Sequence, residues 1–378
     1  MKTVLTSQMI KDKANQIGID DIGIASIEAY KDAPVLMNPK SYFPEAKSVI
    51  VIAMRIPRGS YRGIEEGTHW HNYTYYSYNR LNTVIRPHLT YRIATFIEDF
   101  GWEACPFYPA VPERSAREQR VPGKLPNDIV MNIRLMAAGT GIGEMGHSKV
   151  FLNRKFGPRV RLGLILTDAV LEPDEMMEAN SICNLCGRCV KECPGNAIPP
   201  VKDKRISVNI NSNKVSWGDV QMGRCTLTHH GLNNKISPFL KKSFPHMAFD
   251  VDNTDMTEEE AYRMCYPLSN ANWTTYDESA TGRVIDYEGY LTQQYGYFAL
   301  CGARGCIRAC MDNLEKTKRI ENLFKEPFYK KQSWLLDNKP IKVRKAVNQF
   351  RDDYLDKNYP GIRKGEYGYS EKAEDKDE

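Results

Sequence analysis

Four cysteines stand close together in the middle of the chain, with a spacing that suits a metal cluster. Cys183, Cys186, Cys189 and Cys193 follow the pattern C-x2-C-x2-C-x3-C, and Pro194 comes directly after them. Three thiolates on one short loop can hold one face of a [4Fe–4S] cube, while the fourth ligates a second cube. Zinc sites use separated C-x2-C pairs instead. The spacing therefore predicts iron–sulfur chemistry.

Four cysteines farther along the chain complete two sets of ligands, namely Cys225, Cys301, Cys306 and Cys310. If Cys193 belongs to a second cube, three of these four join it and one returns to the first cube. By reciprocity, the last of them should be the one that returns. We therefore predict one cluster on Cys183, Cys186, Cys189 and Cys310, and a second cluster on Cys193, Cys225, Cys301 and Cys306.

Other residues near these cysteines leave alternatives open. Cys265 could take the place of Cys301 as a ligand, whereas Cys105 lies in a strand pattern and fits a buried, small hydrophobic residue. His229 and His230 could tune the second cluster by hydrogen bonding, or they could be solvated loop residues.

A glycine-rich stretch precedes the cysteines. Gly139 comes first, and Gly141, Gly143 and Gly146 match the pattern G-x-G-x-x-G. This pattern follows a predicted helix and not a strand, so a dinucleotide site is not indicated. The stretch predicts either a helix cap followed by a turn, or a close approach of the backbone to a cofactor.

Several segments together resemble a known superfamily. Residues 127–146 and 156–174, followed by the cysteine run, resemble the shared core of reductive dehalogenases and epoxyqueuosine reductases. Residues 10–26 and the pair Trp217 and Cys225 fit the same core. The motif GPRVRLG at 157–163 is closer to the dehalogenases, and the resemblance covers residues 5–235 and 301–313.

The resemblance implies two [4Fe–4S] clusters and a cobalamin. The corrinoid would lie on the α/β domain near the first cluster, with its base off, and the reduced cobalt would reduce a small organic substrate. Gly139, Gly141, Gly143, Gly146 and Arg159 would contact this cofactor, although Arg159 could equally be a surface charge. The chain contains no D-x-H-x-x-G motif that would supply a lower cobalt ligand.

The resemblance also implies a proton donor. Dehalogenases use a tyrosine with a basic residue nearby, and Tyr75, Tyr76 and Tyr78 compete for this role, with Tyr78 preferred for its place before a predicted long helix. Arg161 could be the basic partner or a surface charge. Asp128 lies near the position of the aspartate that epoxyqueuosine reductases use, and it could instead cap a helix.

Departures from the superfamily pattern keep other functions open. The second cysteine motif, C-x4-C-x3-C, lacks a following proline, and no helical repeat of the kind that binds tRNA follows residue 315. The missing repeat disfavours tRNA as a partner. One alternative is an epoxyqueuosine reductase. Another is an electron-transfer or corrinoid-reactivating protein without its own corrinoid.

Periodicity predicts the elements that position these residues. We expect helices over 5–17, 89–101 and 127–139, and strands over 21–26, 48–56, 102–108 and 159–168. With the resemblance, this pattern predicts an α+β protein with a nitroreductase-like α/β corrinoid domain and a bacterial ferredoxin-like module for two clusters. The predicted boundaries are 1–174 for the first domain, 175–315 for the module with an insert at 226–300, and 316–378 for an extension that ends in a charged, disordered tail.

Composition limits the cellular setting. The net charge is only +5 and the hydrophobic fraction is 42% over 378 residues, as in ordinary globular proteins. No apolar run reaches the length of a membrane span, and no export signal is visible at the N-terminus. We therefore predict a cytoplasmic reductase that receives electrons from a separate low-potential donor, a ferredoxin or flavodoxin.

Overall fold

The computed structural model describes most of the chain apart from the predicted insert and the C-terminal end. The described residues are 4–69, 71–108, 121–123, 131–211, 213–233 and 301–334, with short pieces at 235–236, 251, 256–258, 260–261, 265, 274–277, 282–285 and 299. Asp128, one of the predicted catalytic residues, lies outside them.

A four-stranded antiparallel sheet with the strand order β1-β2-β6-β3 forms the centre of the fold. The strands are β1 (Asp21–Ser26), β2 (Ser48–Arg55), β6 (Val160–Thr167) and β3 (Ala104–Phe107). They confirm the four predicted strands to within two residues at each end. All residues of β2 except Arg55 are buried, as its continuous β-branched run predicts for a strand that is covered on both faces.

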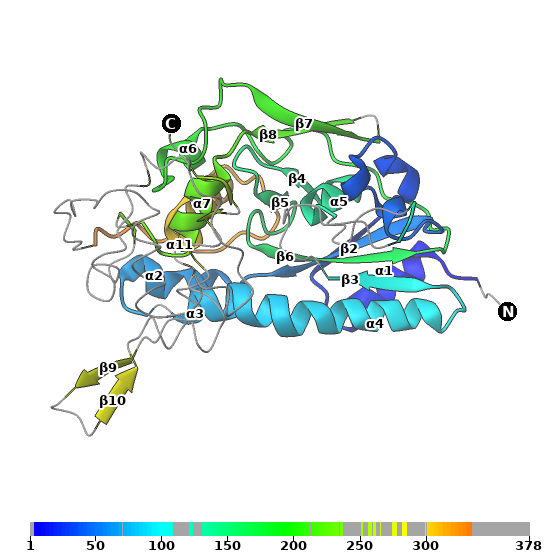
Figure 1. The fold of residues 1–378 in the computed structure, drawn as a ribbon, viewed down its shortest axis with the longest axis horizontal. Helices are drawn as coiled ribbons and strands as arrows, with labels where there is room; N and C mark the ends of the chain where they lie inside the picture. Colours follow the sequence, from blue (N-terminus) through cyan, green and yellow to red (C-terminus); the bar gives the residue numbers. More distant parts are fainter. Residues whose placement is uncertain are drawn as a thin grey trace, which may run out of the picture.

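Helices cover both faces of this sheet (Figure 1). On one face, Ile50 and Ile52 share a hydrophobic core with Ile93 of α4 (Arg86–Glu98) and with α1 (Ser7–Gln16). On the other face, Val51 shares a second core with Leu135 of α5 (Ile133–Gly139). Alternate residues of β2 therefore pack into two separate hydrophobic cores. The protein is of the mixed α and β class.

Two predicted helices begin at other positions than the sequence indicates. The amide side chain of Asn132 caps α5 by accepting from the backbone N–H groups of Arg134 and Leu135, so the helix starts later than the predicted residue 127. The long helix α4 spans 86–98 instead of 89–101. It is preceded by the short helix α3 (His71–Tyr73) and by two π-helical segments, Thr74–Asn79 and Leu81–Ile85.

The cysteine-bearing elements gather at one end of the sheet, near α2 and α3 (Figure 1). The remaining elements are α2 (Arg62–Glu66), β4 (Gly143–Met145), β5 (Phe151–Asn153), α6 (Arg188–Lys191), β7 (Arg205–Ile210), β8 (Asn213–Gly218), α7 (Met222–His229), β9 (Thr274–Asp277), β10 (Gly282–Ile285), α11 (Cys301–Arg304) and α12 (Cys306–Lys316). Each of the pairs β4–β5, β7–β8 and β9–β10 forms an antiparallel hairpin.

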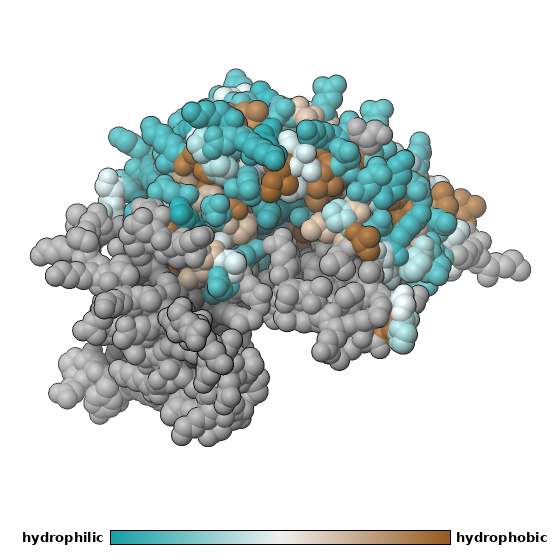
Figure 2. All heavy atoms as spheres, turned by 45° about the horizontal axis from the view of Figure 1, so that its top comes forward, coloured by the Kyte–Doolittle hydropathy of each residue, from teal (hydrophilic) through white to brown (hydrophobic). Residues whose placement is uncertain are grey.

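The visible surface of the described residues is mostly hydrophilic, with hydrophobic side chains in patches between the polar ones (Figure 2). Within the described part of the chain, no helix has the length and the apolar character that crossing a membrane requires.

Candidate functional site

The structure brings together the four cysteines predicted to hold the first cluster. Cys183 and Cys186 lie on the loop that leads into α6, Cys189 lies on α6 itself, and Cys310 lies on α12. Burial raises the pKa of the Cys310 thiol, and the nearby Cys183 and Cys189 thiols raise it further. Burial also raises the pKa of Cys189 to about 12, with contributions from Cys183 and Cys186.

The four cysteines predicted for the second cluster are also neighbours. Cys225 lies on α7, Cys301 on α11 and Cys306 at the start of α12. Burial raises the pKa of the Cys301 thiol well above its usual value, and the Cys306, Cys225 and Cys193 thiols add to the rise. Burial raises the pKa of Cys225 to about 11, and the Cys193 thiol adds to this rise.

We call Cys183, Cys186, Cys189 and Cys310 the outer group, and Cys193, Cys225, Cys301 and Cys306 the inner group. Cys186 is exposed, whereas Cys301 is buried. The described residues contain no set of three His, Cys, Asp or Glu side chains that could hold a metal ion. A single metal ion needs ligands that lie close together, whereas the cysteines around a four-iron cube lie farther apart. Binding of such a cube therefore stays a prediction. The chemistry of the eight thiols fits such a cube.

The two remaining cysteines lie apart from these groups. Burial alone raises the pKa of Cys265, and no neighbouring thiol contributes to that rise. The grouping therefore gives no support to Cys265 as a replacement for Cys301. Cys105 lies on β3 as predicted, but it is only half-buried and its Sγ donates to the Tyr42 hydroxyl at 3.4 Å.

Backbone hydrogen bonds hold the cysteine loop in place. The Glu144 carboxylate accepts from the N–H groups of Ile182, at 2.8 Å, and Cys183. The N–H of Ala197 donates to the Cys193 sulfur at 3.3 Å. Hydrogen bonds of this kind orient cluster ligands and tune the reduction potential of the cluster.

A buried ion cluster fastens α11 and α12 to α2. Glu65 of α2 is fully buried, and its carboxylate lies 2.8 Å from the Arg308 Nε atom. The guanidinium of Arg304 donates to the Glu65 carbonyl at 3.2 Å, and the N–H of Gln332 donates to the Glu65 carboxylate at 3.0 Å. The Trp334 ring stacks on Arg304 at 3.8 Å. This Glu65 clamp positions the helices that carry Cys301, Cys306 and Cys310.

Tyr78 and Arg161, predicted as proton donor and basic partner, are in contact. The Arg161 guanidinium lies 4.1 Å from the centre of the Tyr78 ring, and its Nε donates to the Ser77 carbonyl at 2.5 Å. The His229 ring lies 5.0 Å from the Tyr78 ring on another side. Tyr78 belongs to a π-helical segment, a form often found at functional sites.

A buried tyrosine connects Tyr78 with the inner group. The Tyr73 ring lies 5.8 Å from the Tyr78 ring, and burial raises the pKa of Tyr73 well above its usual value. A Cβ at Gly302 would lie 1.8 Å from the Tyr73 hydroxyl, so only glycine fits beside Cys301. The resemblance implies a reaction centre near the first cluster, whereas the structure puts Tyr78 beside the inner group, which is the second.

The other predicted polar residues have different surroundings. Tyr76 is exposed, and the Tyr75 hydroxyl accepts from the Arg80 Nε at 2.7 Å. Arg159 is buried, and its guanidinium donates to the Ile56 carbonyl and to the Asn322 side chain. The alternative of a surface charge is therefore wrong for Arg159, and its burial argues against contact with a cofactor.

The four predicted glycines pack against the protein itself. A Cβ would collide with the Tyr30 hydroxyl at Gly139, with the Glu175 carbonyl at Gly141, and with the Leu152 carbonyl at Gly143. At Gly146, a Cβ would make a tight contact with the Leu152 side chain. Gly141 has a φ of +74°, so the turn after α5 needs glycine for its backbone as well. These contacts account for the glycines without a cofactor, and cofactor binding stays a prediction.

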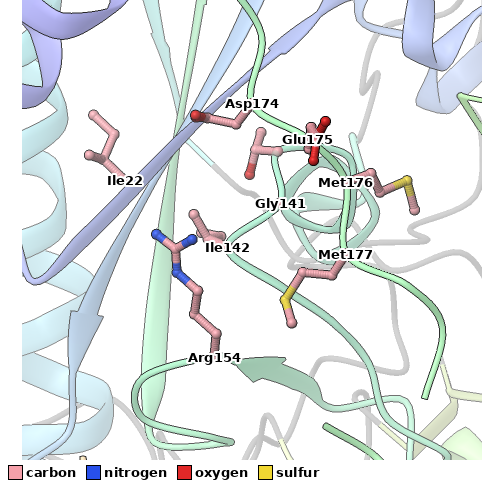
Figure 3. Close-up of a pocket in the computed structure, with 9 residues that line it drawn as sticks. Ile22, Gly141, Ile142, Arg154, Asp174, Glu175, Met176 and Met177 are labelled. Atoms are coloured by element: carbon pink, nitrogen blue, oxygen red, sulfur yellow. The ribbon is translucent and has the colours of Figure 1, made fainter. Parts of the chain in front are cut away.

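Gly141 nevertheless borders a pocket of about 370 Å³. The Gly141 turn lies between the Arg154 side chain and residues 174–177 (Figure 3), and Ile22, Thr140 and Ile142 complete the lining. A volume of this size suits a small ligand or one part of a large cofactor.

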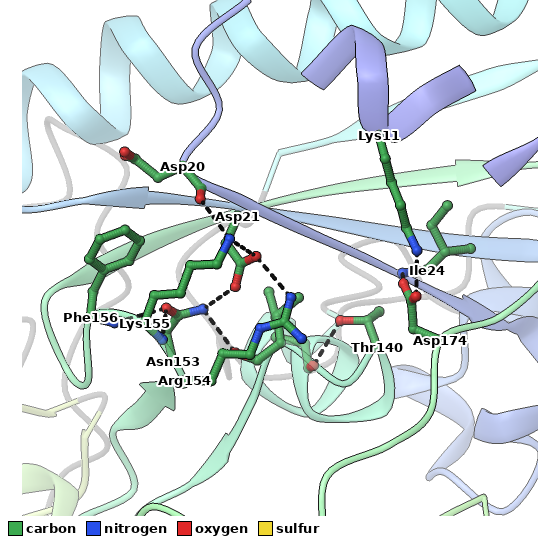
Figure 4. Close-up of polar contacts among 12 residues, drawn as sticks. Lys11, Asp20, Asp21, Ile24, Thr140, Asn153, Arg154, Lys155, Phe156 and Asp174 are labelled. Carbon is green, nitrogen blue, oxygen red and sulfur yellow. Dashed lines mark hydrogen bonds and ion pairs between the residues drawn. The ribbon is translucent and has the colours of Figure 1, made fainter. Parts of the chain in front are cut away.

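Ion pairs fix both sides of this pocket (Figure 4). The Asp21 carboxylate on β1 accepts from the Asn153 amide at 2.8 Å and pairs with Lys155 at 2.9 Å. Asp174 pairs with Lys11 and accepts from the N–H of Ile24 at 2.9 Å. These contacts tie the segments on both sides of the glycine turn to β1 of the sheet.

The glycine turn and the Tyr78 cluster lie on opposite faces of the sheet. Gly139 follows Leu135 on α5, which packs on the face with Val51 and Leu164. Arg161 has the opposite parity on β6 and contacts Tyr78, which packs on the core of the α4 face.

Tyr73 and Glu65 were missed by the sequence analysis, because their partners are distant in the chain and neither belongs to a motif.

No family model matches the chain. Among curated proteins, the tetrachloroethene reductive dehalogenase of Dehalobacter restrictus is 30% identical over 120 residues, which are 31% of this chain and 18% of that protein. The epoxyqueuosine reductase of Staphylococcus aureus is 27% identical over 229 residues, which are 52% of this chain and 53% of that protein. The chain thus spans from about a fifth to about half of the relatives that it matches.

Solved structures of the same two groups are similar. An epoxyqueuosine reductase from Streptococcus thermophilus superposes with a TM-score of 0.42 at 14% identity, over 81% of this chain and 79% of that chain. The catabolic reductive dehalogenase NpRdhA gives 0.43 at 15% identity, over 83% and 37%. The relationship rests on the sequence matches. Homologues of this chain include reductive dehalogenases and epoxyqueuosine reductases, as the resemblance predicted. These relatives are reductases, which supports the predicted oxidoreductase class.

Proposed function

We propose that the chain is a corrinoid-dependent iron–sulfur reductase of the dehalogenase type, acting on a small organic substrate. Its fold would combine a nitroreductase-like domain with a ferredoxin-like module for two [4Fe–4S] clusters. The observation that carries this proposal is the stacking of Arg161 on Tyr78 at 4.1 Å, next to the inner cysteine group. It matches the tyrosine and basic residue that the resemblance to dehalogenases implies.

Tyr78 is the proposed proton donor. Replacement of a carbon–halogen bond by a carbon–hydrogen bond takes two electrons and one proton, and releases a halide ion. The Tyr78 hydroxyl would give up the proton, and the positive charge of Arg161 over the ring would stabilise the phenolate that remains. The hydrogen bond from Arg161 to the Ser77 carbonyl holds the guanidinium in this position.

The two clusters that the eight cysteines would hold would carry the electrons. The outer group would hold the cluster that is reduced from outside, because Cys186 is exposed. The inner group would hold the cluster next to the reaction centre, because Cys301 is buried beside Tyr73. A bound corrinoid would supply the strongly reducing cobalt centre. The pocket at Gly141 lies on the opposite face of the sheet from Tyr78, so it is not part of this proposed reaction centre.

Metal analysis tests this proposal. The chain is purified without oxygen from cells supplied with cobalamin, and iron and cobalt are measured before and after reduction. We expect both metals, together with the absorbance change of cobalt reduction. Iron without cobalt would support an electron-transfer protein instead, and absence of iron would contradict the proposal.

Epoxyqueuosine reduction is the second candidate. The match to the Staphylococcus aureus epoxyqueuosine reductase covers 52% of this chain, compared with 31% for the dehalogenase match. Binding of an epoxyqueuosine-containing tRNA stem–loop that weakens steeply with salt would favour this candidate. Turnover of an organohalide without any effect of tRNA would favour the first.

A further inference from the structure

We propose that the surface around Cys186 is the docking site of a small acidic electron-transfer protein of the ferredoxin type. This inference deepens the proposed function and rests on it to the extent that the outer group must hold a cluster. The donor would pass one electron at a time to that cluster, and its own cluster would be oxidised in each transfer.

The exposure of the outer group gives the first reason. Cys186 is the exposed member of the eight predicted ligands, whereas Cys301 of the inner group is buried. Electron transfer between proteins slows steeply with distance, so a donor must approach the part of the relay that reaches the surface. That part is the loop around Cys186.

Basic residues surround this loop. Arg188 and Lys191 lie on α6, which begins two residues after Cys186. Val201 packs beside Gly187, where a Cβ would lie 3.8 Å from its side chain, and the exposed Lys202 and Lys204 follow Val201 in the chain. We call Arg188, Lys191, Lys202, Lys204, Lys316 and Lys318 the basic collar.

The far side of the collar comes from the end of α12. The Arg319 guanidinium donates to the carbonyls of Asn180, at 2.7 Å, and Ile182, at 3.0 Å, on the cysteine loop. This places the exposed Lys318 next to the loop. Arg188 and Lys316 both pair with Asp312.

Acidic residues do not cancel the collar. Asp312 is buried and shared between two basic partners. Glu192 pairs with Lys331 outside the collar. Among the described residues, Asp203 and Glu178 are exposed acids near the loop and Glu321 is an exposed acid just after Arg319, and the exposed Lys191, Lys202, Lys204, Lys316 and Lys318 outnumber them. Within the part of the chain that the structure describes, the surface around Cys186 therefore carries more basic than acidic side chains.

An acidic protein is the partner that this surface fits. Complementary charge accelerates encounter and orients the partner, and its effect disappears at high ionic strength. A nucleic acid would also be attracted by lysines, but it has no use for an exposed cluster ligand at the centre of the collar. The combination of the two features favours an electron donor.

The experiment measures how fast a reduced acidic ferredoxin reduces the clusters of the full chain in stopped flow, at several salt concentrations. The double variant Lys202→Glu/Lys204→Glu is compared with wild type. Lys47→Glu/Arg92→Glu is the matched control, with the same change of charge at two exposed residues before β2 and on α4. Dithionite reduces all three proteins as a reference that needs no docking.

We expect the collar variant to be reduced on the order of tenfold more slowly by ferredoxin at low salt, with no difference at high salt or with dithionite. The control variant should behave like wild type. Equal rates for both variants, or slowing without salt dependence, would overturn the docking site. So would loss of tRNA stem–loop binding in the collar variant with unchanged reduction by ferredoxin. Absence of clusters in all three proteins would instead refute the proposed function.

Discussion

The two cysteine groups differ in how the fold holds them. Three cysteines of the outer group lie on the loop before α6 and on α6 itself, with Cys186 exposed and with Asp312 joining Arg188 and Lys316 beside them, and Cys310 lies on α12. Two cysteines of the inner group, Cys301 and Cys306, lie on α11 and α12, which Glu65 fastens to α2, and Cys301 is buried beside Tyr73. A redox partner can therefore approach a ligand of the outer group, whereas Cys301 of the inner group is enclosed by the protein.

This difference gives the relay a direction. A charge that enters at the exposed group and leaves at the buried one arrives next to Tyr78 and Arg161, where the described residues place the predicted proton donor. If both groups were exposed, the structure would not indicate which cluster receives the electron first. The following predictions test whether the inner group depends on its surroundings as this comparison requires.

The largest effect is expected from Glu65→Ala. Removal of the carboxylate leaves Arg304 and Arg308 buried without their acidic partner, which should cost about 3–5 kcal/mol of stability. Chemical unfolding under nitrogen measures this change. Glu66→Ala is the control, because Glu66 pairs on the surface with Arg62 and should change stability by about 0.5 kcal/mol or less. Similar losses of unfolding free energy in both variants would show that the buried ion pairs of Glu65 do not stabilise the fold more than a surface pair does.

Tyr78→Phe should lower turnover at least about 100-fold while iron and cobalt contents stay unchanged. The ring still stacks on Arg161 in this variant, and only the proton is lost. Steady-state rates with a chemical reductant measure the effect. Tyr76→Phe should keep nearly full activity because Tyr76 points to solvent. If Tyr76→Phe is the inactive variant, the assignment of the donor is wrong.

A smaller effect concerns pH. Burial lowers the pKa of His229 well below its usual 6.5, so the folded chain binds this proton less readily than the unfolded chain. Below about pH 6.5 the unfolded state takes up a proton that the folded state refuses, and stability should fall by up to about 1.4 kcal/mol per pH unit. His229→Asn should remove part of this loss, and replacement of the exposed His88 should not. Thermal unfolding at pH 7.5 and 5.5 separates these outcomes, and equal pH dependence in wild type and His229→Asn would contradict the burial of His229.

The sequence predicted those features that depend on neighbours in the chain. The strand at 48–55 follows from a continuous apolar run, whereas the division of the eight cysteines between two clusters stays a prediction. The pairing of Tyr78 with Arg161 came from the resemblance. The strand signal lies within a short segment, whereas Tyr78 and Arg161 are 83 positions apart in the chain.

The features that were missed depend on distant partners. Glu65 meets Arg308 from 243 positions away, which no local pattern records. Arg159 reads as a surface charge on an alternating strand, yet Asn322 and the Ile56 carbonyl satisfy its guanidinium inside the protein. Burial of a charge is decided by what packs over it, and periodicity alone does not contain that information.

Cys306 and Cys310 test the division of the thiols most directly, because they lie one turn apart on α12 and belong to different groups. Cys306→Ser and Cys310→Ser are purified without oxygen, and their clusters are counted by iron analysis and electron paramagnetic resonance. We predict that each variant keeps one four-iron cluster, that the two remaining clusters have different spectra, and that the double variant keeps none. Two intact clusters in either variant, or the same remaining cluster in both, would contradict the account.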